Sequence, residues 1–77
     1  MIDTKTRWQC RRGTRELDQL LLRWFDAHYA TASERRKSAF RTLLELQDPE
    51  LIAYLIQGET PADPELNEVV NAICRSP

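Results

Sequence analysis

The chain has 77 residues, of which 42% are hydrophobic and 30% charged, and its formal net charge is −1. This composition is typical of a folded chain and argues against a disordered one, and the length argues against two domains. So small a core leaves little room to enclose a large cofactor, which favours a binding or helper role over a self-contained active site. We therefore predict one domain over residues 1–77.

The charges are unevenly distributed along the chain. Residues 1–44 carry ten basic and five acidic side chains, whereas residues 45–77 carry one basic and seven acidic ones. A dipolar chain of this kind can dock on a protein partner by charge complementarity. The rival interpretation is a nucleic-acid binder that uses the basic N-terminal segment and would show steep salt dependence. Because such proteins are more often basic overall, no nucleic-acid partner is predicted.

No apolar run comes near the roughly 20 residues that a membrane span needs. The first seven residues, Met-Ile-Asp-Thr-Lys-Thr-Arg, have no apolar stretch behind them, so no secretory signal is expected. The prediction is a cytoplasmic protein without membrane insertion. The two cysteines, Cys10 and Cys74, are then expected to be reduced thiols. No metal site is predicted, because the chain has no Cys-x-x-Cys motif and a single histidine.

Helical periodicity runs through the chain, with no hairpin signal and no long alternating strand. A first helix is predicted over about residues 4–12, capped by Asp3 or Thr4 and anchored by Trp8, its one large apolar residue. Gly13 should end this helix, because glycine tolerates the left-handed conformation that ends helices. A second helix is predicted over about residues 14–30, with one apolar stripe at helical spacing. Its members are Leu17, Leu20, Leu21, Trp24, Phe25 and His28.

Three more helices follow from capping signals. The third should start near Thr31, which has the Thr-x-x-Glu spacing of a capping box, and stop before Pro49. The fourth should be capped by Asp48 and end at Gly58, and the fifth should be capped by Asp63. The residues expected to be buried in the third helix are Phe40, Leu43, Leu44 and Gln47. Those of the fourth helix are Leu51, Ile52, Leu55 and Ile56, and those of the fifth are Leu66, Val69, Val70, Ile73 and Cys74. The predicted fold is all-α, a single compact bundle of five short helices.

Catalytic patterns are not evident in the sequence. His28 lies on the apolar stripe of the second helix and is interpreted as a partly buried histidine of the core or its rim. No Ser-His-Asp or Cys-His set stands out, and two isolated glycines cannot form a phosphate-binding loop. We therefore predict that the chain is not an enzyme.

The segment Cys10-Arg11-Arg12-Gly13-Thr14-Arg15-Glu16-Leu17-Asp18 stands out. Without a side chain, Gly13 would let another backbone or a flat ligand approach closely. Two arginines before the glycine and a carboxylate one turn after it would make a directional docking surface. The alternative is a glycine helix break flanked by solvated charges, which are common and usually inert.

The same segment contains the Arg-Gly-x-x-Glu motif of the succinate dehydrogenase FAD-assembly (flavinylation) factors, and the chain resembles that family over about residues 5–75. The opening Trp-x-Cys-Arg-Arg-Gly-x-Arg-Glu-Leu-Asp, residues 8–18, is similar to theirs. Further matching stretches are Phe25-x-x-His28-Tyr29, Leu43-Leu44-Glu45, Asp48-Pro49-Glu50-Leu51 and Pro61-Ala62-Asp63-x-Glu65-Leu66. Thr14 departs from the family, which often has an apolar residue at this variable position.

The resemblance implies a five-helix protein that binds the flavoprotein subunit of succinate dehydrogenase and, in bacteria, of fumarate reductase. There it would promote covalent attachment of FAD to a histidine, so FAD belongs to the client and no cofactor is held stably by this chain. Arg12, Gly13 and Glu16 correspond to the family's signature, and Arg11 and Asp18 join them as partner-binding candidates by position. Bacterial members of the family are also labelled antitoxins. The alternative is therefore an antitoxin-type interaction protein that acts on a different protein partner.

Overall fold

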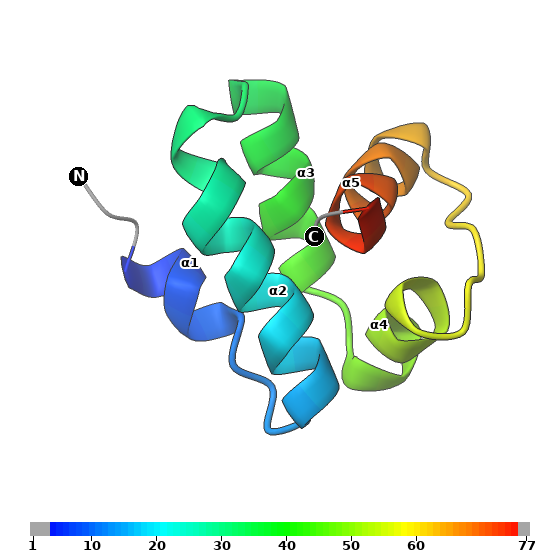
Figure 1. The fold of residues 1–77 in the computed structure, drawn as a ribbon. Helices are drawn as coiled ribbons and strands as arrows, with labels where there is room; N and C mark the ends of the chain where they lie inside the picture. The colour runs from blue at the N-terminus through cyan, green and yellow to red at the C-terminus, as the bar shows by residue number, and fades with distance from the viewer. Residues whose placement is uncertain (1–3, 76–77) are drawn as a thin grey trace.

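The computed structural model describes residues 4–75, which form helices joined by short irregular segments (Figure 1). The elements are α1 (Thr4–Gln9), α2 (Arg15–His28), the 3-10 turn η1 (Tyr29–Thr31), α3 (Glu34–Leu44), α4 (Asp48–Leu55) and α5 (Pro64–Arg75). The described range contains no strand, so the prediction of an all-α bundle of five short helices is confirmed. Asp3, one of the two predicted caps of α1, lies outside the described residues.

The core contains an aromatic cluster where α2 meets α3, and aliphatic residues of α2, α3, α4 and α5 surround it. Phe40 of α3 is fully buried, and its ring stacks on Trp24 of α2 with centroids 4.7 Å apart. Phe25 and Tyr29 complete the cluster at 6.2 and 5.8 Å from Phe40. Figure 1 shows α5 against α3 and above α4, with α1 on the opposite side of α2 from both. The bundle therefore has α1 as its outlying element.

The apolar stripe of α2 is confirmed in its central part. Leu17, Leu21, Trp24 and Phe25 are buried, whereas Leu20 is only partly so. His28 is exposed, so its placement in the core or rim was wrong. The stripe reaches the end of α2 at this residue, and it is Tyr29, the first residue of the 3-10 turn, that enters the core instead.

The start of α3 differs from the prediction. Ser33 is the N-cap, and its hydroxyl accepts a hydrogen bond from the backbone N–H of Arg36 at 3.1 Å. Thr31 belongs to the preceding 3-10 turn, where its hydroxyl donates to the carbonyl of His28 at 3.3 Å. The Thr31–Glu34 capping box was therefore wrong, because the inserted 3-10 turn moves the helix start two residues along the chain.

The junction between α3 and α4 was also misplaced. Helix α3 ends at Leu44, and Gln47, which was expected on its buried face, is an exposed residue at the N-cap of α4. Asp48 is the first residue of α4 and not its cap, although Pro49 sits in the first turn as expected. Asp63 does cap α5 as predicted, since its Oδ1 accepts from the N–H of Glu65 at 2.9 Å.

Helix α1 packs on the bundle with small residues, and its largest one faces solvent. Thr6 and Cys10 are buried, whereas Trp8 is 70% exposed, so its role as the anchor of α1 was wrong. Residues two apart on a helix lie about 200° from each other, so a helix that buries Thr6 turns Trp8 outward. Cys10, the first residue after α1, continues the buried side. Arg7 fixes the orientation by a two-pronged ion pair with Asp26 of α2, at 3.1 and 3.2 Å.

Two further predictions about burial were wrong, those for Ile56 and Cys74. Ile56, the residue that follows α4, is 41% exposed, and Cys74, the next-to-last residue of α5, is exposed. Burial raises the pKa of the Cys10 thiol to about 12, so this cysteine stays protonated. Within residues 4–75, no helix is both long and apolar enough to cross a membrane.

Candidate functional site

The five candidate residues lie at the junction of α1 and α2 and are called here the signature patch: Arg11, Arg12, Gly13, Glu16 and Asp18. Gly13 has a φ of +79°, a conformation that glycine adopts without steric cost. A Cβ atom built at Gly13 would have no neighbour within 4 Å, and the residue is exposed. The backbone conformation therefore favours glycine here, and the residue is exposed to solvent.

Arg12 and Asp18 hold the loop in shape. The backbone N–H of Arg12 donates to Oδ1 of Asp18 at 2.5 Å, which closes the loop onto the first turn of α2. The Arg12 side chain is only 19% exposed, and its Nη2 donates to the carbonyl of Leu44, the last residue of α3. A cation at the C-terminal end of a helix is stabilised by the helix dipole. The loop is thus tied to a segment 32 residues further along the chain.

A weaker contact completes the environment of Arg12. Its Nε lies 4.0 Å from Oδ1 of Asp48 at the start of α4. This nitrogen is buried and has no hydrogen-bond partner among the described residues. Arg12 therefore joins the α1–α2 loop to the α3–α4 junction through its largely buried side chain.

Arg11, Gly13 and Glu16 form the outward part of the patch. All three are exposed, and neither charged side chain has an ion-pair partner in residues 4–75. Glu16 lies in the first turn of α2, whose N-cap Thr14 makes no side-chain cap bond. A carboxylate there complements the positive helix end and stays available to a partner. The sequence predicted all five residues as one docking surface. In the structure three of them are exposed, whereas Arg12 and Asp18 form hydrogen bonds within the protein.

A cation–π contact beside this surface was not predicted from the sequence. The guanidinium carbon of Arg11 lies 5.9 Å from the centroid of the Trp8 ring, within the range of a cation–π contact. The sequence did contain a signal for this contact. Thr6 and Cys10 are small residues four positions apart, a spacing that favours one buried side and so an exposed Trp8.

The signature patch is separate from the hollow at the other end of α2. That hollow has a volume of about 520 Å³ and contains none of the five patch residues. It is lined by Trp24, His28, Thr31, Ala32, Ser33, Arg36, Ala72 and Arg75. Among residues 4–75, no group of three or more His, Cys, Asp or Glu side chains could hold a metal ion. The signature patch combines the exposed backbone of Gly13 with the charged side chains of Arg11 and Glu16. These groups can form hydrogen bonds and ion pairs with another protein surface.

The division within the patch leads to a stability prediction. We expect Asp18→Ala to lower the free energy of unfolding by about 1.5–3 kcal/mol, because a charged acceptor is removed from the N–H of Arg12. Glu16→Ala should stay within about 0.5 kcal/mol of the parent, since Glu16 is exposed. Urea unfolding followed by circular dichroism measures both. Equal stabilities for the two variants would show that the bond to Asp18 does not hold the loop.

Known proteins of one family resemble this chain over most of its length. The family model described as "Flavinator of succinate dehydrogenase" matches residues 4–77. The chain is similar to proteins named FAD assembly factor SdhE. It is 43% identical to that of Yersinia pseudotuberculosis over 74 residues, which is 94% of this chain and 84% of the relative. It is 40% identical to that of Pectobacterium atrosepticum, with the same coverage.

A third relative extends the comparison. The protein of the same name from Shewanella oneidensis is 44% identical over 66 residues, 86% of this chain and 80% of the relative. The match to the family model runs over residues 4–77, which include the helical bundle and the signature patch. The chain therefore belongs to the flavinator of succinate dehydrogenase family.

Proposed function

We propose that this protein is an assembly factor that binds the flavoprotein subunit of succinate dehydrogenase and promotes covalent attachment of FAD to it. Membership of the flavinator family, with a match over residues 4–77, is the observation that carries the proposal. The relatives at 40–44% identity are named as FAD assembly factors, which favours this function over the antitoxin alternative. Fumarate reductase, whose flavoprotein subunit the resemblance also implies, is a second client in this proposal.

The signature patch is the surface proposed to meet the flavoprotein. Gly13 offers an uncovered backbone with no atom within 4 Å of its Cβ position, so a partner backbone can come close. Arg11 and Glu16 stand exposed on either side in sequence and offer a donor fork and an acceptor. Arg12 and Asp18 contribute indirectly in this proposal, because their bonds fix the loop that presents Gly13.

The contribution of this chain would be positioning. Attachment of FAD to a histidine uses the reactivity of the flavin, and the helper would hold the flavoprotein and its FAD in the productive arrangement. FAD belongs to the client in this proposal, and the chain itself acts without a resident cofactor and without enzymatic chemistry of its own. A cytoplasmic location, where the client subunit would be met before assembly, stays a prediction.

Deleting the gene tests the function. We expect covalent flavin on the succinate dehydrogenase flavoprotein, seen as fluorescence in a denaturing gel, to fall sharply in the deletion strain and to return with the wild-type gene. The total amount of the flavoprotein, measured by immunoblot, is the control. Unchanged flavin fluorescence in the deletion strain would overturn the proposal. The antitoxin alternative predicts instead a growth defect that persists in a strain without the flavoenzyme.

A further inference from the structure

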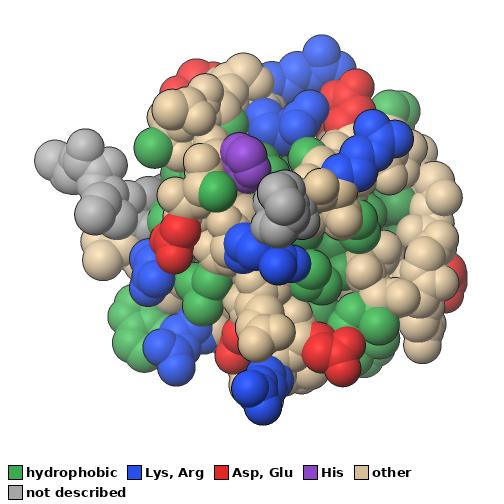
Figure 2. Space-filling model, in the orientation of Figure 1, with side chains coloured by type: hydrophobic (Ala, Val, Ile, Leu, Met, Phe, Trp, Pro, Cys, Tyr) green, Lys and Arg blue, Asp and Glu red, His purple; other side chains and the backbone are tan. Residues whose placement is uncertain are grey.

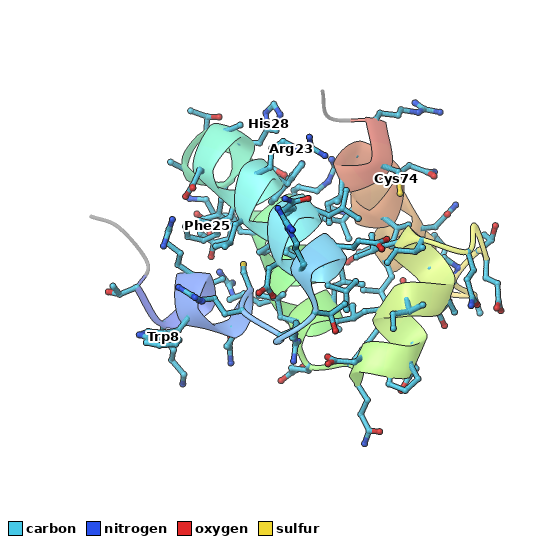
Figure 3. All side chains as sticks on the ribbon, turned by 60° about the horizontal axis from the view of Figure 1, so that its bottom comes forward. Trp8, Arg23, Phe25, His28 and Cys74 are labelled. Carbon is cyan, nitrogen blue, oxygen red and sulfur yellow. The ribbon has the colours of Figure 1, made fainter. Side chains whose placement is uncertain are left out.

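We propose that Trp8 is the apolar anchor of the interface with the flavoprotein, seated in an apolar slot that acidic side chains border. This inference rests on the proposed function and adds a contact outside the Arg-Gly-x-x-Glu motif. It begins from the position of Trp8, which is 70% exposed on a helix whose inner face is formed by Thr6 and Cys10. Figure 3 shows Trp8 on the side of α1 that points away from the bundle.

The fold does not account for a tryptophan at this position. Thr6 and Cys10 bury α1 against the bundle, and the Arg7–Asp26 ion pair fixes its orientation. The other tryptophan, Trp24, is 2% exposed and stacks on Phe40, which is the usual place for so large an apolar side chain. Tryptophan and arginine are the residues most enriched at the energetic centres of protein interfaces.

The surroundings of Trp8 define the chemistry of its partner. Lys5 and Arg11 lie three residues before and after it, so one cation flanks the ring on each side along the helix. Both are exposed, and neither forms an ion pair with another residue of the range 4–75. In Figure 2, hydrophobic surface lies beside Lys and Arg side chains over α1, at the lower left. An apolar slot between carboxylates complements this face.

Continuity with the signature patch identifies the occupant. Arg11 belongs to the patch and also lies over the Trp8 ring at 5.9 Å. Its backbone N–H donates to the carbonyl of Trp8 at 3.0 Å, so one turn of chain connects the two. A flavoprotein surface that lies on Gly13 and Arg11 therefore reaches Trp8 with little change of direction, and the interface extends from the loop along α1.

Binding of purified variants to the purified flavoprotein subunit tests the anchor. We expect Trp8→Ala to weaken binding about 30-fold, as for a hot-spot residue, and Trp8→Phe to lie between Ala and wild type. The melting temperature of Trp8→Ala should stay within about 4 °C of the wild type, because an exposed side chain is removed. Lys5→Glu should weaken binding more than Lys5→Gln. If Lys5→Glu binds with the same affinity as the wild type, the proposal that acidic side chains of the flavoprotein border the slot is wrong.

Ile56→Ala is the matched control, since Ile56 is the other large hydrophobic exposed in residues 4–75, at 41%. It follows α4, on the opposite side of the bundle from α1 (Figure 1). We expect this variant to bind as the wild type does. An equal loss for Ile56→Ala and Trp8→Ala, or full affinity of Trp8→Ala, would overturn the anchor. A wild-type chain that fails to bind the flavoprotein would overturn the proposed function, and the anchor with it.

A spectroscopic measurement reports on Trp8 directly. The chain labelled with 5-fluorotryptophan has two ¹⁹F signals, from Trp8 and Trp24, which the Trp8→Phe variant assigns. In the free chain only the Trp8 signal should shift between H₂O and D₂O, because Trp24 is buried. We expect this solvent shift to disappear when unlabelled flavoprotein is added. A complex in which Trp8 keeps its solvent shift would show that the ring lies outside the interface.

Discussion

Replacing Gly13 by asparagine should leave the protein folded and reduce covalent flavin on the flavoprotein at least about tenfold. Asparagine is one of the few residues that tolerate a positive φ, and the +79° of Gly13 requires that tolerance. The added Cβ atom has room, since no atom beyond the two neighbouring residues lies within 4 Å of its position. Its expected effect is therefore on whatever approaches Gly13 from outside. Complementation of the deletion strain, with flavin fluorescence in denaturing gels, measures the loss.

The chain offers a matched control for this substitution. Gly58, after α4, has a φ of +81° and no atom within 4 Å of its Cβ position. Gly58→Asn therefore imposes the same backbone demand away from the signature patch and should support full flavinylation. If Gly13→Asn flavinylates as well as Gly58→Asn, the uncovered backbone at position 13 is not a docking surface. Arginine at position 13 is a less discriminating variant, because it adds backbone strain to the steric block.

Replacing Phe40 by alanine should have the largest effect on stability, a loss of about 3–5 kcal/mol in the free energy of unfolding. Phe40 is fully buried and contacts the rings of Trp24, Phe25 and Tyr29 at centroid distances between 4.7 and 6.2 Å. Truncation would open a cavity where α2 and α3 meet. A chain of 77 residues has a small core and marginal stability, so much of the variant should be unfolded at 37 °C.

Thermal unfolding followed by circular dichroism measures this loss, and Trp8→Ala is the comparison. The latter removes more side-chain atoms than Phe40→Ala, but from a residue that is 70% exposed. We expect a large drop in the melting temperature for Phe40→Ala and a small one for Trp8→Ala. Similar drops for the two variants would mean that Trp8 contributes to the fold after all, in conflict with its role as an interface anchor.

The two tryptophans show how far residue type predicts placement. Trp24 belongs to an apolar stripe that repeats along α2, so its burial follows from the periodicity. Trp8 stands in a short helix without such a stripe, and its size alone suggested an anchor. The structure turns it outward because Thr6 and Cys10 select the inner face of α1. In a helix of six residues, packing against the neighbour decides the orientation.

Helix α1 ends at Gln9, so the prediction that Gly13 ends this helix was wrong. The sequence by itself determined the helical class, the apolar stripe of α2, the left-handed glycines Gly13 and Gly58 and the cap at Asp63, because these depend on neighbours a few residues away. It also contained the Arg-Gly-x-x-Glu motif by which the family was identified. Only the tertiary structure decided which motif residues face outward. Arg12 turns inward because its side chain donates to the carbonyl of Leu44. That carbonyl is 32 residues away in the chain, so local sequence does not predict the contact. Such a contact forms only when α2 and α3 have packed, and that packing leaves Arg11, Gly13 and Glu16 at the surface.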